Sequence, residues 1–356
     1  MFARRCSSVV AALAVLGAGA ATPLATRAQT RTIAPICIAC KKAAGLRFNY
    51  RDRDLERVDG ANITIWRPYE PATGEVHGFA LGLGATGAAS INGIAIAPVG
   101  IVAEQRFRGI GVAGLGYGVG DSAGTRGILV AGLGGGIGGS FAGISVAGLG
   151  NGIGGDVTGI TVAGLGNGIG GNVTGILVAG LGAGVAGTMK GIAVAGLGVG
   201  GGSVEGIFVA GLGAGLGGRA RGITVAGLGA GVGGSIEGLL VAGLGAGAGE
   251  RIKGIAVAGL GVGTPAIEGL VVTPIVRTVN ARGAVVALSF KAHDKDAEAN
   301  ARGFFVAPVN DIRGMQRGIS IGVVNYARAL KGLQIGVVNI VTDGRGPRIM
   351  PLINWR

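Results

Sequence analysis

One apolar pattern recurs along most of the chain. Counting from the glycine that precedes an apolar-x-apolar triplet, the repeat reads G-I-x-V-A-G-L-G-x-G-V-G-G-x-V-x, and the next repeat usually begins 15 or 16 residues later. This register holds between residues 78 and 269 and continues in degraded form at Gly283, Gly303, Gly318 and Gly332. Self-similarity at a short fixed period is typical of repeat architectures, so we expect one array to occupy most of the chain.

Each repeat predicts a β-strand followed by a corner. Apolar residues at positions 2 and 4 alternate with a variable position 3, which is the period of a half-buried strand. Leu at position 7 and Ile or Val at position 11 lie on the opposite parity, so a corner or bulge is expected at the Ala-Gly pair of positions 5 and 6. We therefore expect positions 2, 4, 7 and 11 to fill the core and positions 14 to 16 to form a solvent-exposed edge of each repeat.

Two all-β folds accommodate such a repeat. In a β-solenoid each repeat is one coil, and equivalent positions stack about 4.8 Å apart. In an outer-membrane up-and-down barrel of about 16–18 strands, each repeat is one strand with a turn, and neighbours run antiparallel. A barrel of that size lines its channel with polar side chains, whereas neither parity of this repeat is polar. We therefore predict the solenoid and keep the barrel as the alternative.

Two further periodicities bear on this choice. Position 3 alternates between large residues such as Leu177 and Phe208 and small ones such as Ala193 and Thr224. This period of two repeats is what duplication of a hairpin would leave, and it favours the barrel. The last position alternates in sign, which suits a ladder of opposite charges in a solenoid or two oppositely charged rims in a barrel. Its residues are Lys190, Glu205, Arg221, Glu237, Lys253, Glu268 and Arg282.

Composition narrows the class of protein. The 356 residues include 79 glycines, 49% hydrophobic residues, 4% aromatic residues and 14% charged residues. Disordered chains are more polar, and collagen would need glycine at every third residue. Between residues 127 and 187 the only charge is Asp156. Membrane-spanning helices are nevertheless not expected, because each interior glycine costs a helix about 1 kcal/mol relative to alanine.

The N-terminus has the features of an export signal. Arg4 and Arg5 precede an apolar run and then small residues. Residues 1–28 are therefore expected to be a signal peptide that is removed. The predicted location of the remaining chain is the outer membrane or cell surface of a Gram-negative-type bacterium.

A charged lead-in is expected at residues 29–59, before the Gly-rich repeats of residues 60–282. Within it, residues 49–59 (NYRDRDLERVD) are predicted to be a solvated linker or a partner contact. Cys37 and Cys40 are expected to form a local disulfide, because an exported protein meets oxidising conditions and no second cysteine pair or nearby histidine supports a metal site.

The divergent repeats of residues 283–356 resemble a known family. They contain GISIGVVNYARALK from Gly318, GLQIGVVNIV from Gly332 and MPLINWR at the end. These strings resemble the G-[LI]-x-I-G-x-x-N repeats of bacterial exported surface repeat proteins, which close with a Leu-Pro-Leu-x-Asn-like ending, here displaced slightly at Pro351 and Asn354. The resemblance is specific over residues 303–356 and implies an envelope or surface location, without an activity or functional residues.

Few residues offer candidate chemistry. A charged insertion at residues 291–302 lengthens one repeat, and insertions in repeat proteins lie in exposed loops. We expect a partner-contact loop there rather than a calcium site, because the pattern lacks the glycine and terminal acid of a helix-flanked calcium loop. The loop residues are His293, Asp294, Lys295, Asp296 and Glu298.

No catalytic, cofactor or metal site is predicted. G-x-G-x-x-G strings occur by chance in a chain this rich in glycine, and none opens a helix after a strand. His77 lies near Glu75, and Ser145 occupies the variable position of a strand, but no nucleophile and base can be paired. Asn151 and Asn167 fall at position 9 of adjacent repeats and are expected to stack as an amide ladder.

These observations predict a non-enzymatic exported envelope or surface protein with a structural or adhesive role. Its expected partners are an outer-membrane or cell-surface component and further copies of itself, and no small-molecule ligand is identifiable. Removal of residues 1–28 takes three of the 31 basic residues and none of the 18 acidic ones, which leaves an excess of +10. This excess suits an anionic membrane surface or glycan, and it equally suits a role in solubility alone. Nucleic acid is not expected, because the chain is predicted to be exported and has few aromatic residues to stack on bases. The alternative function is an outer-membrane barrel that passes a small apolar solute.

Overall fold

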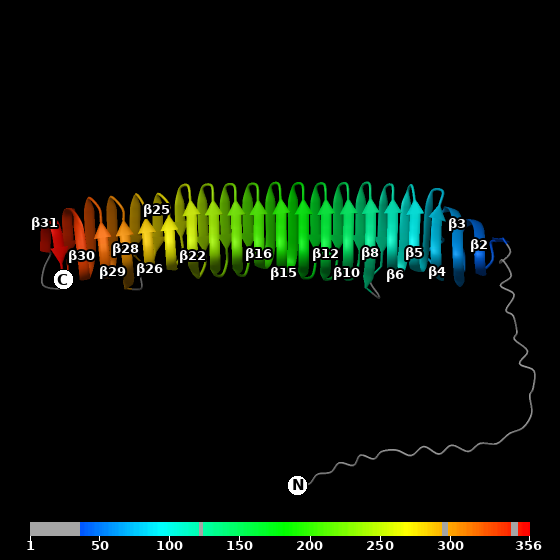
Figure 1. The fold of residues 1–356 in the computed structure, drawn as a ribbon, viewed down its shortest axis with the longest axis horizontal. Coiled ribbons are helices and arrows are strands. Elements are labelled where there is room, and N and C mark those ends of the chain that lie inside the picture. Colours follow the sequence, from blue (N-terminus) through cyan, green and yellow to red (C-terminus); the bar gives the residue numbers. More distant parts are fainter. Residues whose placement is uncertain (1–35, 121–123, 294–297, 343–347) are drawn as a thin grey trace, which may run out of the picture.

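The chain folds into a rod of stacked β-coils. The computed structural model describes residues 36–120, 124–293, 298–342 and 348–356, in which 31 strands form one continuous hydrogen-bonded system. Figure 1 shows the strands side by side along the long axis, with β2 near one end and β31 at the other. The fold is a β-solenoid of about 18 turns, as predicted from the repeat.

Each coil contributes to two parallel sheets, a long one and a short one. Several strands bend through a corner and contribute to both. The strands that contribute to the long sheet are β2 (Lys42–Arg51), β3 (Arg57–Trp66), β4 (Glu75–Gly82), β5 (Ala85–Ala97), β6 (Gly100–Ala113), β8 (Thr125–Ala131), β10 (Phe141–Ala147), β12 (Val157–Ala163), β14 (Val173–Ala179), β15 (Gly182–Ala195), β16 (Gly198–Ala210), β18 (Ala220–Ala226), β20 (Ile236–Ala242), β22 (Arg251–Ala258), β24 (Ala266–Val272), β26 (Asn280–Val286), β28 (Ala299–Val306), β29 (Val309–Ile321) and β30 (Val324–Val341). Strand β1 (Cys37–Ile38) also joins the long sheet, where it pairs with Arg47 and Phe48 of β2. The strands of the short sheet alone are β7 (Gly116–Val119), β9 (Gly134–Ile137), β11 (Gly150–Ile153), β13 (Gly166–Ile169), β17 (Gly213–Leu216), β19 (Gly229–Val232), β21 (Gly245–Ala248), β23 (Gly261–Gly263), β25 (Ile275–Thr278) and β27 (Ser289–Ala292).

Equivalent positions of neighbouring coils pair in register. Gly143 pairs with Gly127 on one side and with Gly159 on the other, and Ile153 pairs with Ile137 and Ile169. All these pairings are parallel. They exclude the barrel alternative, in which consecutive repeats would run antiparallel.

The core is made by positions 3, 5, 9, 11 and 15 of the repeat. In the coil that begins at Gly159, Thr161, Ala163 and Val173 are buried, whereas Leu165 is 47% exposed. The expectation that positions 2, 4 and 7 fill the core is therefore wrong, and only position 11 was placed correctly. Successive strand residues point to opposite faces, so burying positions 15, 3 and 5 turns positions 2 and 4 outward.

The alternation of size at position 3 has its cause inside the rod. Leu177, Ala193, Phe208, Thr224 and Leu240 stack on successive coils, and each is almost completely buried. A large side chain above a small one lets neighbouring rungs interlock at the density of a protein interior. The two-repeat period thus reflects packing between parallel rungs and gives no support to a barrel.

The glycine at position 1 is required by the close approach of the coils. At Gly143 and its equivalents φ lies in the left-handed region, from +112° at Gly318 to +147° at Gly332. A Cβ at these positions would overlap with the carbonyl oxygen of the first glycine in the preceding coil. This constraint explains why the register glycine persists where the rest of the repeat diverges.

The stack of coils begins before the Gly-rich repeats. Strand β2 lies within the segment that was expected to be a charged lead-in, and Gly45 pairs with Gly60 as one register glycine with the next. Asp52 and Leu55 are each 3% exposed. The prediction of a solvated linker at residues 49–59 is therefore wrong, because its charges include a buried residue of the first coils.

At the other end of the rod, the last strand reverses direction. Strand β31 (Arg348–Trp355) pairs antiparallel with β30, so the register Ile335↔Ile353 closes the final coil. The pairing shifts register between Gly336↔Leu352 and Asn339↔Met350, where β31 contains Pro351 and where Leu352 has φ +66°. Proline and a local bulge on an edge strand disfavour further strand addition, so β31 acts as a terminal cap.

Candidate functional site

The outer face of the long sheet is apolar along the middle of the rod. Ile or Leu at position 2 and Val at position 4 point away from the core because of the strand alternation. Their side chains are exposed or half-buried, with values of 42% for Ile110, 37% for Ile192 and 45% for Ile255. A soluble strand normally carries polar residues on this side, so the feature needs an explanation.

A row of leucines follows the corner beside this face. Backbone hydrogen bonds join each corner to the next, as where the Leu165 amide donates to the Leu149 carbonyl oxygen at 2.7 Å. The leucine side chains are 46–57% exposed in the ten coils that begin from Gly109 to Gly254. The members of this row are Leu115, Leu133, Leu149, Leu165, Leu181, Leu197, Leu212, Leu228, Leu244 and Leu260.

We call positions 2, 4 and 7 of these ten coils the apolar ribbon. With strands about 4.8 Å apart and a rise of about 3.3 Å per residue, the ribbon is about 48 Å long and about 17 Å wide, or roughly 800 Å². The largest apolar patch on a typical soluble monomer is about 300–600 Å². The ribbon exceeds that range and is the best candidate for a functional surface.

A row of alternating charges borders the ribbon at position 16. Lys190 contacts Glu205 at 3.3 Å, and Arg221 contacts Glu237 at 3.1 Å, each pair spanning two neighbouring coils. Exposed pairs of this kind contribute little to stability, about 0.2–1 kcal/mol each. Their effect on the surface is larger, because they leave the border of the ribbon without net charge from Lys190 to Glu268. At the other end of the ribbon the same row holds two exposed arginines, Arg108 and Arg126, which pair in register.

The outer face of the short sheet carries almost no side chains. Positions 8 and 10 are both glycine over most of the ribbon's length, for example Gly166 and Gly168. A Cβ placed at Gly152, Gly168 or Gly184 would have no neighbour within 4 Å. Unlike the glycine at position 1, these residues are not required by contacts within the coil.

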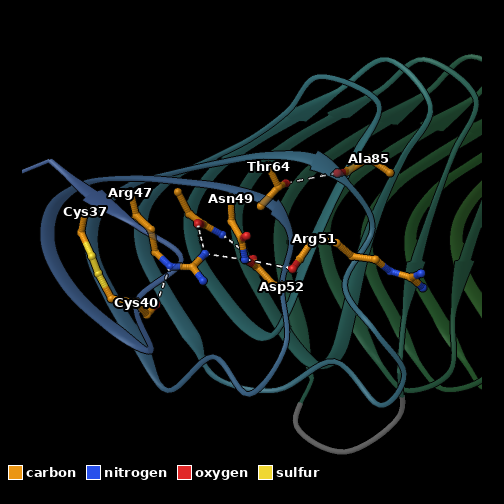
Figure 2. A network of polar contacts seen from close by, with 9 residues as sticks. Cys37, Cys40, Arg47, Asn49, Arg51, Asp52, Thr64 and Ala85 are labelled. Atoms are coloured by element: carbon orange, nitrogen blue, oxygen red, sulfur yellow. Dashed lines mark hydrogen bonds and ion pairs between the residues drawn. A yellow bond between two sulfur atoms is a disulfide. The ribbon is translucent and has the colours of Figure 1, made fainter.

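The first coils contain a buried polar cluster. Arg47 is 1% exposed; its Nε donates to the Cys40 carbonyl oxygen at 2.7 Å, and its Nη1 contacts the Asp52 carboxylate and donates to Asn62 Oδ1 at 2.7 Å. Asn49 and Asn62 each donate to Asp52, at 2.8 and 2.9 Å. Figure 2 shows Arg47, Asn49 and Asp52 gathered inside the first coils, next to the Cys37–Cys40 disulfide, whose Cα atoms are 6.2 Å apart. The cluster closes the apolar core with satisfied polar groups.

The last coils are closed in a similar way by amide side chains. Asn310 Nδ2 donates to Asn325 Oδ1, and Asn325 Nδ2 donates to Asn339 Oδ1, both at 2.8 Å. Gln334 Nε2 donates to Gln316 Oε1 at 2.9 Å in a second stack. All five side chains are buried. The amide ladder expected in the middle of the chain thus occurs at the C-terminal end, in the repeats that carry the G-x-x-N pattern.

Asn151 and Asn167 lie in register, as expected, but their amides bond elsewhere. Their Nδ2 atoms donate to the carbonyl oxygens of Val162 and Val178, at 3.2 and 2.6 Å. Asn151 Oδ1 also accepts from the hydroxyl of Tyr117 at 2.8 Å.

The Tyr117 side chain crosses one complete coil to make this contact. Its hydroxyl lies 2.6 Å from Ser145 Oγ, and the ring occupies the space beside Gly135, where a Cβ would overlap with it. Burial raises the pKa of the Tyr117 phenol, and the hydrogen bond with Ser145 opposes this effect. A buried, hydrogen-bonded phenol is a structural element here, since its hydrogen-bond partners in the described residues are Ser145 and Asn151 and neither is a base.

The other residues singled out by sequence remain separate from one another. His77 lies 3.1 Å from Glu75 on the surface. Glu298 pairs with Arg328 at 3.0 Å, whereas His293 lines a cavity of about 260 Å³ with Arg277, Lys291, Asp311 and Arg313. Asp294, Lys295 and Asp296 lie outside the described residues. Within the described ranges no group of three or more His, Cys, Asp or Glu side chains is placed to hold a metal ion.

Comparison with known proteins adds no relative. No protein family, curated protein or solved structure matches the chain. The predicted signal peptide at residues 1–28 lies outside the described residues. In the part of the chain that the structure describes, no helix is long and apolar enough to cross a membrane.

Proposed function

We propose that the protein is a non-enzymatic structural module of the bacterial cell envelope, a rod that associates with a second copy through its apolar ribbon. The observation that carries the proposal is the size of the ribbon, which is larger than a soluble monomer normally exposes. The envelope location is part of the proposal and is supported by the predicted export signal and the family resemblance in the sequence. The channel function is not proposed, because it depended on a barrel.

A second copy fits the ribbon for two reasons. A stable interface buries about 800 Å² of each partner, which is the size estimated for the ribbon. The side chains of the ribbon also recur at the spacing of the coils, so only a partner with the same spacing of about 4.8 Å can match every row along its length. Another copy of this chain has that spacing.

The border of the ribbon favours a protein partner over an anionic lipid surface. Lys190 and Arg221 already pair with Glu205 and Glu237 of neighbouring coils. A surface that binds anionic lipid would place unpaired basic residues beside the apolar side chains. From Lys190 to Glu268 the border instead resembles the polar rim of an interface between proteins, whereas Arg108 and Arg126 at its other end have no ion pair among the described residues.

A structural role also agrees with the placement of the polar side chains. The buried ones, such as Arg47 at one end and Asn325 at the other, close the core and have their partners inside the coils. In the described residues, no serine, threonine or histidine is paired with a base and aimed at an open cavity. Nothing in this arrangement suggests acyl, phosphoryl or glycosyl transfer.

The experiment compares two triple variants of the chain by sedimentation over a range of protein concentrations. Leu165→Glu/Leu181→Glu/Leu197→Glu introduces three carboxylates into the ribbon. Its matched control, Gly152→Glu/Gly168→Glu/Gly184→Glu, introduces three carboxylates on the short sheet, where side chains meet no neighbour. We expect the wild type and the glycine variant to dimerise and the leucine variant to remain monomeric.

Two results would contradict the proposal. One is a wild-type chain that remains monomeric up to its solubility limit. The other is a dimer that the glycine variant abolishes and the leucine variant leaves intact, which would transfer the interface to the short sheet. Circular dichroism of each variant confirms that the coils are folded.

A further inference from the structure

The alternating charges at position 16 stop alternating in the last coils. Between Lys190 and Glu268, each basic residue of this row is followed by an acidic one. Beyond it, Arg282, Arg302, Arg317 and Lys331 pair in register on successive strands. Four cations therefore follow one another at the spacing of the coils, all with exposed side chains.

These four cations have no ion pair among the described residues. Other basic residues of the same coils do, since Arg313 lies 3.4 Å from Asp311 and Arg328 lies 3.0 Å from Glu298. Like charges directly opposite each other on neighbouring strands destabilise a sheet. The row is thus electrostatically unfavourable for the isolated rod, in contrast to the paired section upstream.

The first three members of this row line a groove. A cavity of about 320 Å³ is bounded by Arg282, Arg302 and Arg317, together with the amide side chains of Asn280 and Asn300. The carboxylate of Glu268 also lines it, beside Arg282, so the unopposed positive charge is that of Arg302 and Arg317. The arginines come from position 16 of their coils, whereas the asparagines come from position 14. The groove therefore follows the axis of the rod along one corner of the coils. Guanidinium groups and amides border most of it, and one carboxylate borders its first coil.

We propose that this groove binds a linear acidic polysaccharide, with its chain parallel to the rod and its carboxylates against successive arginines. Guanidinium groups form charge-assisted, often bidentate hydrogen bonds with carboxylates. The amides of Asn280 and Asn300 can both donate and accept, which suits sugar hydroxyls. The inference is independent of the self-association proposed above, because it concerns other residues in other coils.

The shape of the groove and its lining distinguish this ligand from other anions. No aromatic residue lines the groove, whereas proteins that bind single-stranded nucleic acids stack the bases on aromatic rings. A row of charges along a corner also matches a polymer better than a flat membrane surface. A short anion such as inorganic phosphate would engage only one or two of the arginines.

The test measures binding of the full chain to immobilised polygalacturonate at low ionic strength. The variant Arg302→Gln/Arg317→Gln is expected to weaken binding about tenfold or more, because each substitution removes a charge-assisted contact. Its matched control is Lys190→Gln/Arg221→Gln, which changes the net charge equally but in the paired section. The control is expected to alter the affinity by about twofold or less, since those cations are already neutralised.

Three outcomes would overturn the inference: no binding of polygalacturonate by the folded wild type, equal weakening by the two variants, or tighter binding of single-stranded DNA with the same dependence on Arg302 and Arg317. Equal weakening would mean that net charge alone attracts the polymer. Preference for DNA would identify the groove as a nucleic-acid site. Both variants change exposed residues, and their thermal midpoints serve as the folding control.

Discussion

Two glycines of one coil differ in whether the backbone requires glycine at that position, and this difference can be measured. Gly143, at position 1, has φ +141°, and a Cβ there would lie 2.9 Å from the carbonyl carbon of Gly127 and overlap with its oxygen. Gly152, at position 10, does not have a positive φ, and a Cβ there would have no neighbour within 4 Å. We predict opposite effects of alanine at the two positions.

The structure sets the approximate sizes of these effects. Alanine in a sparsely populated backbone region costs about 1–3 kcal/mol, and parting two coils weakens strand hydrogen bonds worth about 1 kcal/mol each. Gly143→Ala should therefore reduce the free energy of unfolding by about 3 kcal/mol or more. Gly152→Ala should raise it by about 0.4–1 kcal/mol, because alanine restricts the unfolded chain without straining the coil.

Urea unfolding combined with hydrogen exchange is the appropriate assay. A solenoid has approximately additive contributions from its coils and their interfaces, so local opening can precede global unfolding. The amides of β10 and β12 should lose protection in Gly143→Ala and keep it in Gly152→Ala. If Gly152→Ala lowers the stability as much as Gly143→Ala does, the assignment of position 10 to open space is wrong.

Three further predictions concern the buried polar groups. Asp52→Ala should destabilise the first coils by about 3–5 kcal/mol, because it leaves the Arg47 guanidinium buried and unpaired, whereas Arg47→Met/Asp52→Leu should recover most of that loss in chemical denaturation. Tyr117→Phe should reduce the unfolding free energy by about 1–3 kcal/mol, since Ser145 and Asn151 lose a buried partner. The pKa of the Tyr117 phenol is raised above its ordinary value of 10.0 in the folded chain. The stabilisation by Tyr117 should therefore be complete below pH 10 and decline as the pH rises through the folded pKa. A Tyr117→Phe chain with the same alkaline loss of stability would contradict this. Asn325→Ala should release the C-terminal coils first, seen as faster hydrogen exchange in β30 and β31 than in β12, because it breaks the amide ladder on both sides.

The repeat allowed the coil and its register to be predicted from sequence, but it did not identify the buried side. The glycine at position 1 and the corner near position 6 are visible as a period of about 16 residues. The inward parity is not visible, because Ile and Val occupy the outward positions 2 and 4, where polar residues normally indicate the surface. Size alternation at position 3, seen in Leu177 and Ala193, was the available signal that this position lies in a close-packed interior.

The first coils were mistaken for a linker for a different reason. A run of charges such as that in residues 49–59 normally indicates a solvated segment, and sequence alone does not reveal that Asp52 meets Arg47 and Asn62 inside the rod. The basic row was not predicted from the sequence, although its signal is present there. Its break in alternation after Glu268 can be read directly from the sequence, although the groove beside it depends on how Asn280 and Asn300 are placed.

The glycines at position 10 also provide evenly spaced sites for substitution along the rod. They form a row on the short sheet, from Gly118 to Gly263, in which the glycines of consecutive coils are about 4.8 Å apart. Because a Cβ at most of these glycines would meet no neighbour within 4 Å, a chosen residue can replace any of those glycines without disturbing the coils. Reactive groups could thus be displayed at known multiples of one strand spacing, on a scaffold whose length is set by the number of repeats.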